Sequence, residues 1–271
     1  MTFVVIDNRN AVIDELWKGE WTRRVCRPHI ALGADGVVLL ERLPEAGAEN
    51  ADIRWRYVNA DGSEGEMCGN GAMCGARFAI EQGLAPNPVR LLTASGIVRA
   101  TLESERVWLD MPDSGPLDMD IAIDNLPLPL TGHAVVVGVP HVVICVEDAD
   151  RWPTAGSFDE VGRAIRYHHR FAPAGVNVNV ISPLPGGSIR MRTWERGVEA
   201  ETLACGTGSV ASALAAFHLG MVSAPVHVVT SSGRTLTADF RMNENRGTDV
   251  RLGGVASLIA TGTMMPDAWQ S

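Results

Sequence analysis

Two short stretches of this sequence, Cys68-Gly69-Asn70-Gly71 and Cys205-Gly206-Thr207-Gly208, share one pattern: a cysteine followed by a turn that is framed by glycines. Each stretch runs directly into an apolar, alanine-rich segment with the character of a helix. The spacing between the two cysteines also separates further identical residues: Gly83 and Gly220, Pro88 and Pro225, Val89 and Val226, Thr93 and Thr230, Ser95 and Ser232, Gly96 and Gly233. A spacing that stays constant over such a segment favours duplication of a structural half over chance similarity between two glycine-rich turns.

The rest of the chain predicts many short strands and few helices. Besides the two helices that follow Cys68 and Cys205 and stop at Gly83 and Gly220, we expect helices over residues 14–26 and near 157–168. Strands are expected over residues 3–6, 36–40, 53–58, 89–92, 97–102, 107–109, 134–137, 142–146, 176–181, 189–194, 226–230, 234–240 and 249–253. This pattern predicts an α+β fold of two pseudo-symmetric halves, each a strand-rich roll around a central helix that starts at Cys68 or Cys205.

Two proline-rich segments, residues 111–116 and 126–130, interrupt the regular pattern near the middle of the chain. We place the domain junction between them. The expected halves are residues 1–115 and 116–271, and we allow the last strand to return to the N-terminal half.

The composition limits the function classes. At 271 residues and 46% hydrophobic content, the chain can form one large core or two modest ones, and the repeat favours two. A net charge of −9 argues against nucleic acid or an anionic membrane as partner, because no basic stripe can neutralise phosphates. No apolar run reaches the roughly 20 residues of a membrane-spanning helix, and no signal segment opens the chain. We therefore expect a cytoplasmic protein.

The cofactor classes are limited in the same way. Lys18 is the only lysine and lies in a polar segment, so a pyridoxal phosphate Schiff base is not expected. The spacing of Cys68 and Cys74 does not suit zinc, and neither a C-x-x-C redox motif nor a complete dinucleotide fingerprint occurs. We expect no metal and no cofactor. Five cysteines form a poor disulfide framework, and three of them are expected to be small buried hydrophobic residues: Cys26, Cys74 and Cys145.

The two cysteine turns suggest acid/base chemistry. A helix N-terminus presents unpaired backbone N–H groups and a partial positive charge, and flanking glycines let a carboxylate approach that backbone. The same position favours the thiolate form of a cysteine. Two such turns could hold one α-carboxylate, while one sulfur removes the α-proton and the other returns a proton from the opposite side. This mechanism would invert a stereocentre without a metal or an organic cofactor.

The two cysteine motifs and the residues around them resemble those of the diaminopimelate epimerase family. Asn59-Ala60-Asp61-Gly62-Ser63 with Glu66-Met67-Cys68-Gly69-Asn70-Gly71 is similar to the first family signature. The second signature resembles Trp194-Glu195-Arg196-Gly197 with Glu201-Thr202-Leu203-Ala204-Cys205-Gly206-Thr207-Gly208. Gly33-Ala34-Asp35-Gly36 and Val176-Asn177 also match in order.

The resemblance implies an epimerase that converts LL- to meso-diaminopimelate, in lysine and peptidoglycan synthesis, with Cys68 and Cys205 as the acid/base pair. It also implies substrate contacts from Asn59, Gly69, Asn70, Asn177, Glu195, Arg196, Gly206 and Thr207. Arg196 could hold a carboxylate and Glu195 an ammonium group. Taken alone, these two residues would more often form an ordinary ion pair, but their place just ahead of the cysteine turn favours substrate contacts. Asn177 alone could equally be a turn residue at a strand end.

Three departures from the family pattern leave the substrate open. The family's N-terminal Gly-Asn-Asp-Phe is represented here only by Thr2-Phe3, Val139 replaces an asparagine before Pro140-His141, and Met73 stands where an arginine is common. The alternatives are the same racemase chemistry on another amino acid, or a catalytically inactive relative that binds an amino acid. The expected partner is a small amino-acid substrate, and a homodimer is left open.

Overall fold

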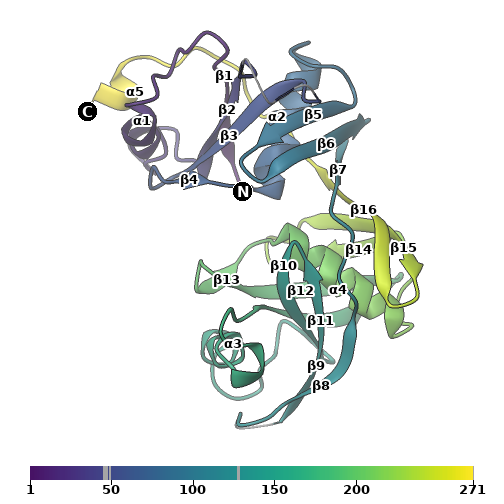
Figure 1. Ribbon diagram of the computed structural model, residues 1–271. Coiled ribbons are helices and arrows are strands. Elements are labelled where there is room, and N and C mark those ends of the chain that lie inside the picture. The colour runs from purple at the N-terminus through teal and green to yellow at the C-terminus, as the bar shows by residue number, and fades with distance from the viewer. Residues whose placement is uncertain (45–47, 49, 127–128, 271) are drawn as a thin grey trace. The chain divides into compact units, whose positions relative to one another are not determined.

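The computed structural model describes residues 1–44, 48, 50–126 and 129–270 and shows a mixed α+β fold rich in strands (Figure 1). The α+β class predicted from the sequence is thereby confirmed. The chain divides into two compact units: unit 1 is Met1–Asp110 with Gly254–Ser271, and unit 2 is Met111–Gly253. The predicted halves at residues 1–115 and 116–271, and their pseudo-symmetry, stay predictions.

Unit 1 contains a mixed sheet with helices on both faces. Its strands run in the spatial order β1 (Phe3–Asp7), β2 (Gly36–Glu41), β3 (Ile53–Asn59), β5 (Val89–Thr93), β6 (Gly96–Glu103) and β7 (Arg106–Asp110), with β4 (Glu64–Gly65) paired to β3. Helix α1 (Lys18–Val25) packs Trp21 and Val25 against Val37 and Leu39 of β2. Successive side chains of a strand point to opposite faces, and Val38 of β2 contacts α2 (Gly69–Glu81) instead.

Unit 2 repeats the combination of a sheet with two covering helices. Its strands run in the spatial order β16 (Arg246–Val255), β15 (Thr235–Asn243), β14 (Val226–Val229), β12 (Ser188–Glu195), β11 (Asn177–Leu184), β10 (Val139–Cys145), β9 (Leu130–Val137) and β8 (Asp118–Ile123), with β13 (Ala200–Thr202) paired to β12. Helix α3 (Phe158–Arg166) and helix α4 (Gly206–His218) both contact β11 and β12.

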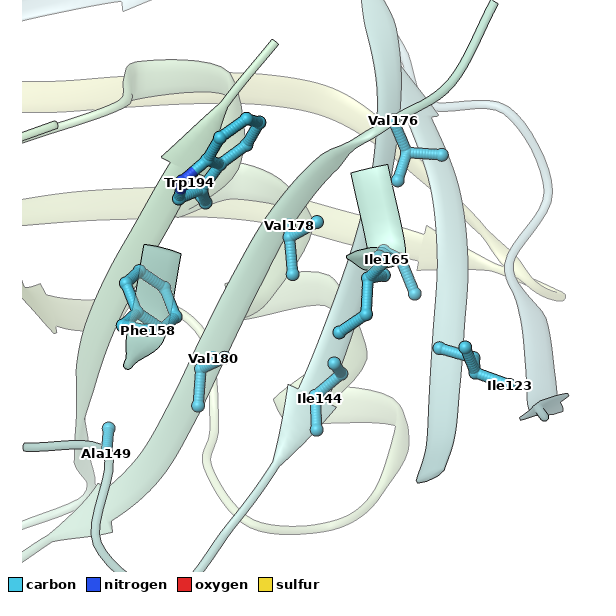
Figure 2. Close-up of a cluster of buried hydrophobic side chains, with 10 residues drawn as sticks. Ile123, Ile144, Ala149, Phe158, Ile165, Val176, Val178, Val180 and Trp194 are labelled. Atoms are coloured by element: carbon cyan, nitrogen blue, oxygen red, sulfur yellow. The ribbon is translucent and has the colours of Figure 1, made fainter. Parts of the chain in front are cut away.

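A buried cluster fixes α3 to one face of this sheet. Figure 2 shows Phe158 and Ile165 of the helix among Val178 and Val180 of β11 and Ile144 of β10. Residues 178 and 180 alternate with Asn177 and Asn179, so the two asparagines project to the opposite face, which α4 covers. The polar residues of β11 therefore lie beside the helix that begins at Cys205.

The two cysteine helices begin and end as the sequence predicts. Each has 13 residues and follows its cysteine directly. At the end of α2 the Gly83 N–H bonds Ile80 O (3.1 Å) and the Leu84 N–H bonds Ala79 O (2.8 Å), with Gly83 at φ 65°. The same pair of bonds closes α4 at Gly220, where φ is 71°. Both ends are Schellman motifs, which require a left-handed residue that glycine supplies without strain.

The local prediction misses the short elements β4, β13, η1 (His169–Phe171) and α5 (Asp267–Gln270), and it differs from the structure at two further places. The first helix starts at Lys18 rather than near residue 14, because the Asp14 carboxylate accepts the Leu16 N–H (2.8 Å) in a side-chain turn that competes with the helix. Strand β8 is not foreseen, since it lies between the two proline segments and pairs with β9 through a register shift between Asp118 and Ile121. Pro127 and Leu128 of the second proline segment lie outside the described residues.

Candidate active site

Cys68 is the N-cap residue of α2 in unit 1. Its backbone is extended (φ −140°, ψ 111°), and its Sγ accepts the Gly71 N–H at 3.5 Å. A sulfur that accepts a backbone N–H at the positive end of a helix is stabilised as a thiolate. Gly69 has nothing within 4 Å of the position a Cβ would occupy, so the backbone of this turn is open to approach.

Cys205 is the N-cap residue of α4 in unit 2 and has a similar backbone (φ −126°, ψ 118°). Its Sγ lies 3.6 Å from Thr207 Oγ1, and the residue is 6% exposed. The Glu195 carboxylate is hydrogen-bonded to the Cys205 side chain and accepts the Thr202 hydroxyl at 2.8 Å. Burial raises the pKa of Glu195 above its ordinary value, and these two hydrogen bonds oppose that rise.

Glu195 is thus tied to the cysteine rather than to its neighbour in the sequence. Among the described residues no ion pair joins Glu195 to Arg196, because adjacent residues at a strand end point to opposite sides. The alternative of an ordinary ion pair between them is wrong. A carboxylate beside a thiol can hold or exchange the proton of that thiol, a role for Glu195 that the sequence alone does not indicate.

Asn177 positions the backbone beside Arg196. The residue is 3% exposed, and its side chain donates from Nδ2 to Pro140 O (3.3 Å) and accepts the Arg196 N–H at Oδ1 (2.8 Å). It therefore links β10 to the end of β12 and is not a turn residue. The Arg196 guanidinium bonds Ala174 O at 3.4 Å and has no carboxylate partner in the described part of the chain, so its fork can receive a ligand.

A buried polar network that sequence reasoning missed lies behind the Cys205 turn. Asn179 is fully buried, accepts the Thr193 hydroxyl at Oδ1 (2.9 Å), and donates from Nδ2 to Val142 O (3.2 Å) and His141 Nδ1 (3.1 Å). A Cβ on Gly208 would overlap Asn179 Oδ1 and come within 3.2 Å of Cys205 Sγ. Gly208 is therefore the residue that lets the network and the sulfur pack together.

His141 is neutral in this network. Burial, with the positive charge of Arg196 as the second cause, lowers the pKa of His141 to about 3. Because Nδ1 accepts from Asn179, the ring proton sits on Nε2, which is buried and has no hydrogen-bond partner among the described residues. The alternation of Asn177 and Asn179, with a histidine on the neighbouring strand, was the sequence signal for this arrangement.

In unit 1, the other predicted contacts lie in loops. Asn59 ends β3 and donates from Nδ2 to Ser63 Oγ (3.1 Å) within the β3–β4 turn. Asn70 donates to Met1 Sδ at 3.2 Å. The structure thus brings Cys205, Glu195 and Thr207 together, and Asn177 with Arg196.

A cavity of about 310 Å³ in unit 1 does not coincide with these residues. It is lined by Pro44, Arg54, Trp55, Arg56, Tyr57, Glu64, Gly65, Leu92, Thr93 and Ala94. Strand β3 pairs with β5 only at Ile53 and Arg54 and with β4 only at Tyr57 and Val58, so a gap opens between those partners. None of the predicted site residues is among its lining.

Two other thiols are in surroundings that suit packing. Burial raises the pKa of Cys26 and of Cys145 to about 11, which disfavours the reactive thiolate. Cys26 is 4% exposed and belongs to the cluster under α1. Cys26 is therefore buried as predicted, whereas Cys74 and Cys145 are only half-buried, so the prediction of a buried residue is wrong at those two positions.

None of the helices in the described residues has the length and apolar character needed to cross a membrane.

A family model described as diaminopimelate epimerase matches residues 2–115 and 133–257. The chain is 40% identical over 248 residues to a diaminopimelate epimerase of Aquifex aeolicus (strain VF5), and the alignment covers 88% of this chain and 86% of the relative. It is 43% identical over 242 residues to that of Hydrogenobaculum sp. (strain Y04AAS1), covering 86% of each.

Solved structures extend the likeness to the fold. A probable proline racemase from Agrobacterium radiobacter K84 superposes with a TM-score of 0.63 at 21% identity, covering 94% of this chain and 84% of that one. A phenazine biosynthesis protein of the PhzF family from Bacillus anthracis has a TM-score of 0.66 at 14% identity, covering 93% and 89%. At these identities the likeness supports the fold alone.

Proposed function

Because the chain belongs to the diaminopimelate epimerase family, whose enzymes work without pyridoxal phosphate, we propose that it converts LL- to meso-diaminopimelate with Cys68 and Cys205 as the two bases. The observation that carries this proposal is that each cysteine caps a 13-residue helix whose first turn contains two glycines. The product would serve lysine and peptidoglycan synthesis.

The α-carboxylate is bound by the backbone of the two turns. N–H groups in the first turn of a helix have no intrahelical acceptor and attract anions. Gly69, Asn70, Gly206 and Thr207 supply these groups. Binding there places the acidic α-carbon next to the sulfurs, and the bound carboxylate is stabilised as negative charge develops on that carbon.

In the resting protein, Cys205 carries the proton and Cys68 is the thiolate. Two contacts support this assignment: Cys68 Sγ accepts the Gly71 N–H, and the Cys205 side chain is hydrogen-bonded to the Glu195 carboxylate. Cys68 takes the α-proton from one face, and the Cys205 thiol delivers its proton to the other. Cys68 then holds a proton and Cys205 is the thiolate, so the reverse reaction restores the starting state.

Arg196 binds the distal carboxylate of the substrate. Its guanidinium fork can form two charge-assisted hydrogen bonds to a carboxylate, and Asn177 fixes the backbone from which it extends. Asn59 is proposed as a further polar contact. The first role proposed for Glu195 is to hold or exchange the proton of Cys205. From that position it can also contact the ammonium group of the substrate.

The test is proton exchange at the α-carbon. The protein is incubated with LL-diaminopimelate in deuterated water, and meso product and α-deuterium are measured. We expect both in the wild type and neither in Cys68→Ala, while Cys205→Ala retains at most exchange without inversion. Cys145→Ala is the matched control, since its half-buried thiol lies outside the site and should leave activity unchanged. Inversion that persists in either active-site variant would refute the two-base mechanism.

The same chemistry on another amino acid is the second candidate, favoured by Val139 where the family pattern has asparagine. A panel of single enantiomers, scored by loss of optical rotation, separates the two substrates. Turnover that is confined to diaminopimelate would exclude this second candidate. Turnover that disappears in Cys68→Ala would exclude an inactive binding protein.

A further inference from the structure

Three metal-ligating side chains converge in unit 2, outside the proposed active site. Asp124 follows the last residue of β8, while His168 caps and His169 begins the short helix η1 (His169–Phe171). One ligand atom from each residue lies within 4.8 Å of the other two. His168 Nε2 is 3.1 Å and His169 Nε2 is 3.9 Å from Asp124 Oδ1.

The two separations from Asp124 Oδ1 are close to those of a tetrahedral zinc site, while the ligand atoms of the two histidines lie within 4.8 Å of each other. Metal–nitrogen and metal–oxygen bonds near 2.0–2.1 Å place neighbouring ligand atoms about 3.3 Å apart. The distance from His168 to Asp124 already has this value within a few tenths of an ångström. The distance from His169 needs to shorten by about half an ångström, which a rotation of its exposed side chain can supply.

The three ligands differ in how firmly they are held. The His168 side chain is 5% exposed, whereas those of His169 and Asp124 are 67% and 63% exposed. One anchored imidazole with two adjustable partners can close around an ion without moving the sheet. The Asp124 carbonyl oxygen, 3.0 Å from His168 Nε2, offers a fourth ligand atom on the same side.

We propose that Asp124, His168 and His169 bind a divalent transition-metal ion of the zinc class. Imidazole nitrogen and carboxylate oxygen suit Zn²⁺, Co²⁺ and Ni²⁺, and the exposed side of the cluster leaves room for a water ligand. The ion would bind to unit 2 alone.

Binding has a structural cost that limits the affinity. His168 Nδ1 accepts the Arg170 N–H at 3.3 Å, so the ring proton resides on Nε2 and is donated to Asp124. A metal on Nε2 displaces that proton to Nδ1, and the bond from Arg170 breaks. We therefore expect a reversible site, weaker than a closed structural zinc site with a prearranged outer shell.

The experiment uses untagged, reduced full-length protein titrated with Co²⁺, whose visible d–d bands report the coordination geometry. We expect bands of a four- or five-coordinate ion without the near-ultraviolet charge-transfer band of a thiolate ligand, and a melting temperature that rises with added Zn²⁺. His169→Ala and Asp124→Ala should each weaken binding by about tenfold or more. The matched control is His218→Ala, which removes an exposed histidine elsewhere in unit 2.

Every outcome bears on the proposal. Loss of binding in the two variants but not in the control supports it. A thiolate charge-transfer band would place the ion on the cysteines and overturn it. Equal binding by wild type and His169→Ala, or no Co²⁺ binding at all, would also overturn it. Epimerase activity does not enter the test, so this site and the proposed function can fail independently.

Discussion

Replacing Gly208 by alanine should destabilise the protein, whereas the same change at Gly71 should not. Both glycines are the third residue of a cysteine helix, so the chemical change and the local position are the same. At Gly71 a Cβ would meet only ordinary contacts, at 3.4 Å from Trp55 and 3.5 Å from Val38. At Gly208 it would overlap Asn179 Oδ1, which three hydrogen-bonded neighbours hold in place.

The free energies follow from these contacts. Alanine in place of glycine in a helix gains up to about 1 kcal/mol, and at Gly71 little opposes this gain. At Gly208, overpacking costs about 1–3 kcal/mol. Displacing Asn179 from the Thr193 hydroxyl leaves buried polar atoms unpaired, at a further cost of about 1–3 kcal/mol. The net destabilisation of Gly208→Ala is therefore about 1–5 kcal/mol, whereas Gly71→Ala is neutral or slightly stabilising.

Equilibrium urea unfolding of both variants measures the difference, and a double-mutant cycle identifies its cause. Asn179→Ala removes the atom that the new methyl group overlaps, so Gly208→Ala should cost less in that background than in the wild type. If Gly208→Ala unfolds at the same urea concentration as Gly71→Ala, or if its cost is unchanged in the Asn179→Ala background, the close packing behind Cys205 is wrong.

Three further predictions concern single residues. Burial raises the pKa of Glu195, so the protonated carboxyl group is the form that suits the folded state. The contribution of Glu195 to stability is therefore fully present at pH values below the ordinary carboxyl range and is lost as the pH rises through the folded pKa. Glu195→Gln should therefore gain in urea midpoint relative to wild type at about pH 8 but not at about pH 4, and equal differences at both would contradict the burial. Gly220→Ala should lower stability by about 1–2 kcal/mol, since its φ of 71° is left-handed while no atom lies within 4 Å of the new Cβ, and a neutral effect would argue against the Schellman end. Arg196→Lys should raise the KM for diaminopimelate about 10- to 100-fold through loss of the fork, and an unchanged KM in steady-state assays would remove Arg196 from the distal carboxylate.

The parts of this protein that the sequence determines are the ones governed by local chemistry. A cysteine and glycines before an apolar run, with a glycine after it, specify where α2 and α4 begin and end, because capping and left-handed glycine geometry involve only neighbouring residues. The two cysteine motifs in this setting also sufficed to indicate the family. Strand β8 could not be predicted from its own residues, because its pairing depends on β9 and is interrupted by a register shift between Asp118 and Ile121.

The surroundings of these motifs are decided only by the tertiary structure. Glu195 is assigned to Cys205 rather than to Arg196 because a strand end turns adjacent side chains apart. Asn179 meets His141 and Gly208 because strand pairing and helix packing bring distant residues to one face. Asp124 and His168 converge for the same reason, with neither residue part of a local motif. Sequence spacing cannot express such contacts, because they depend on which strands become neighbours when the sheet forms.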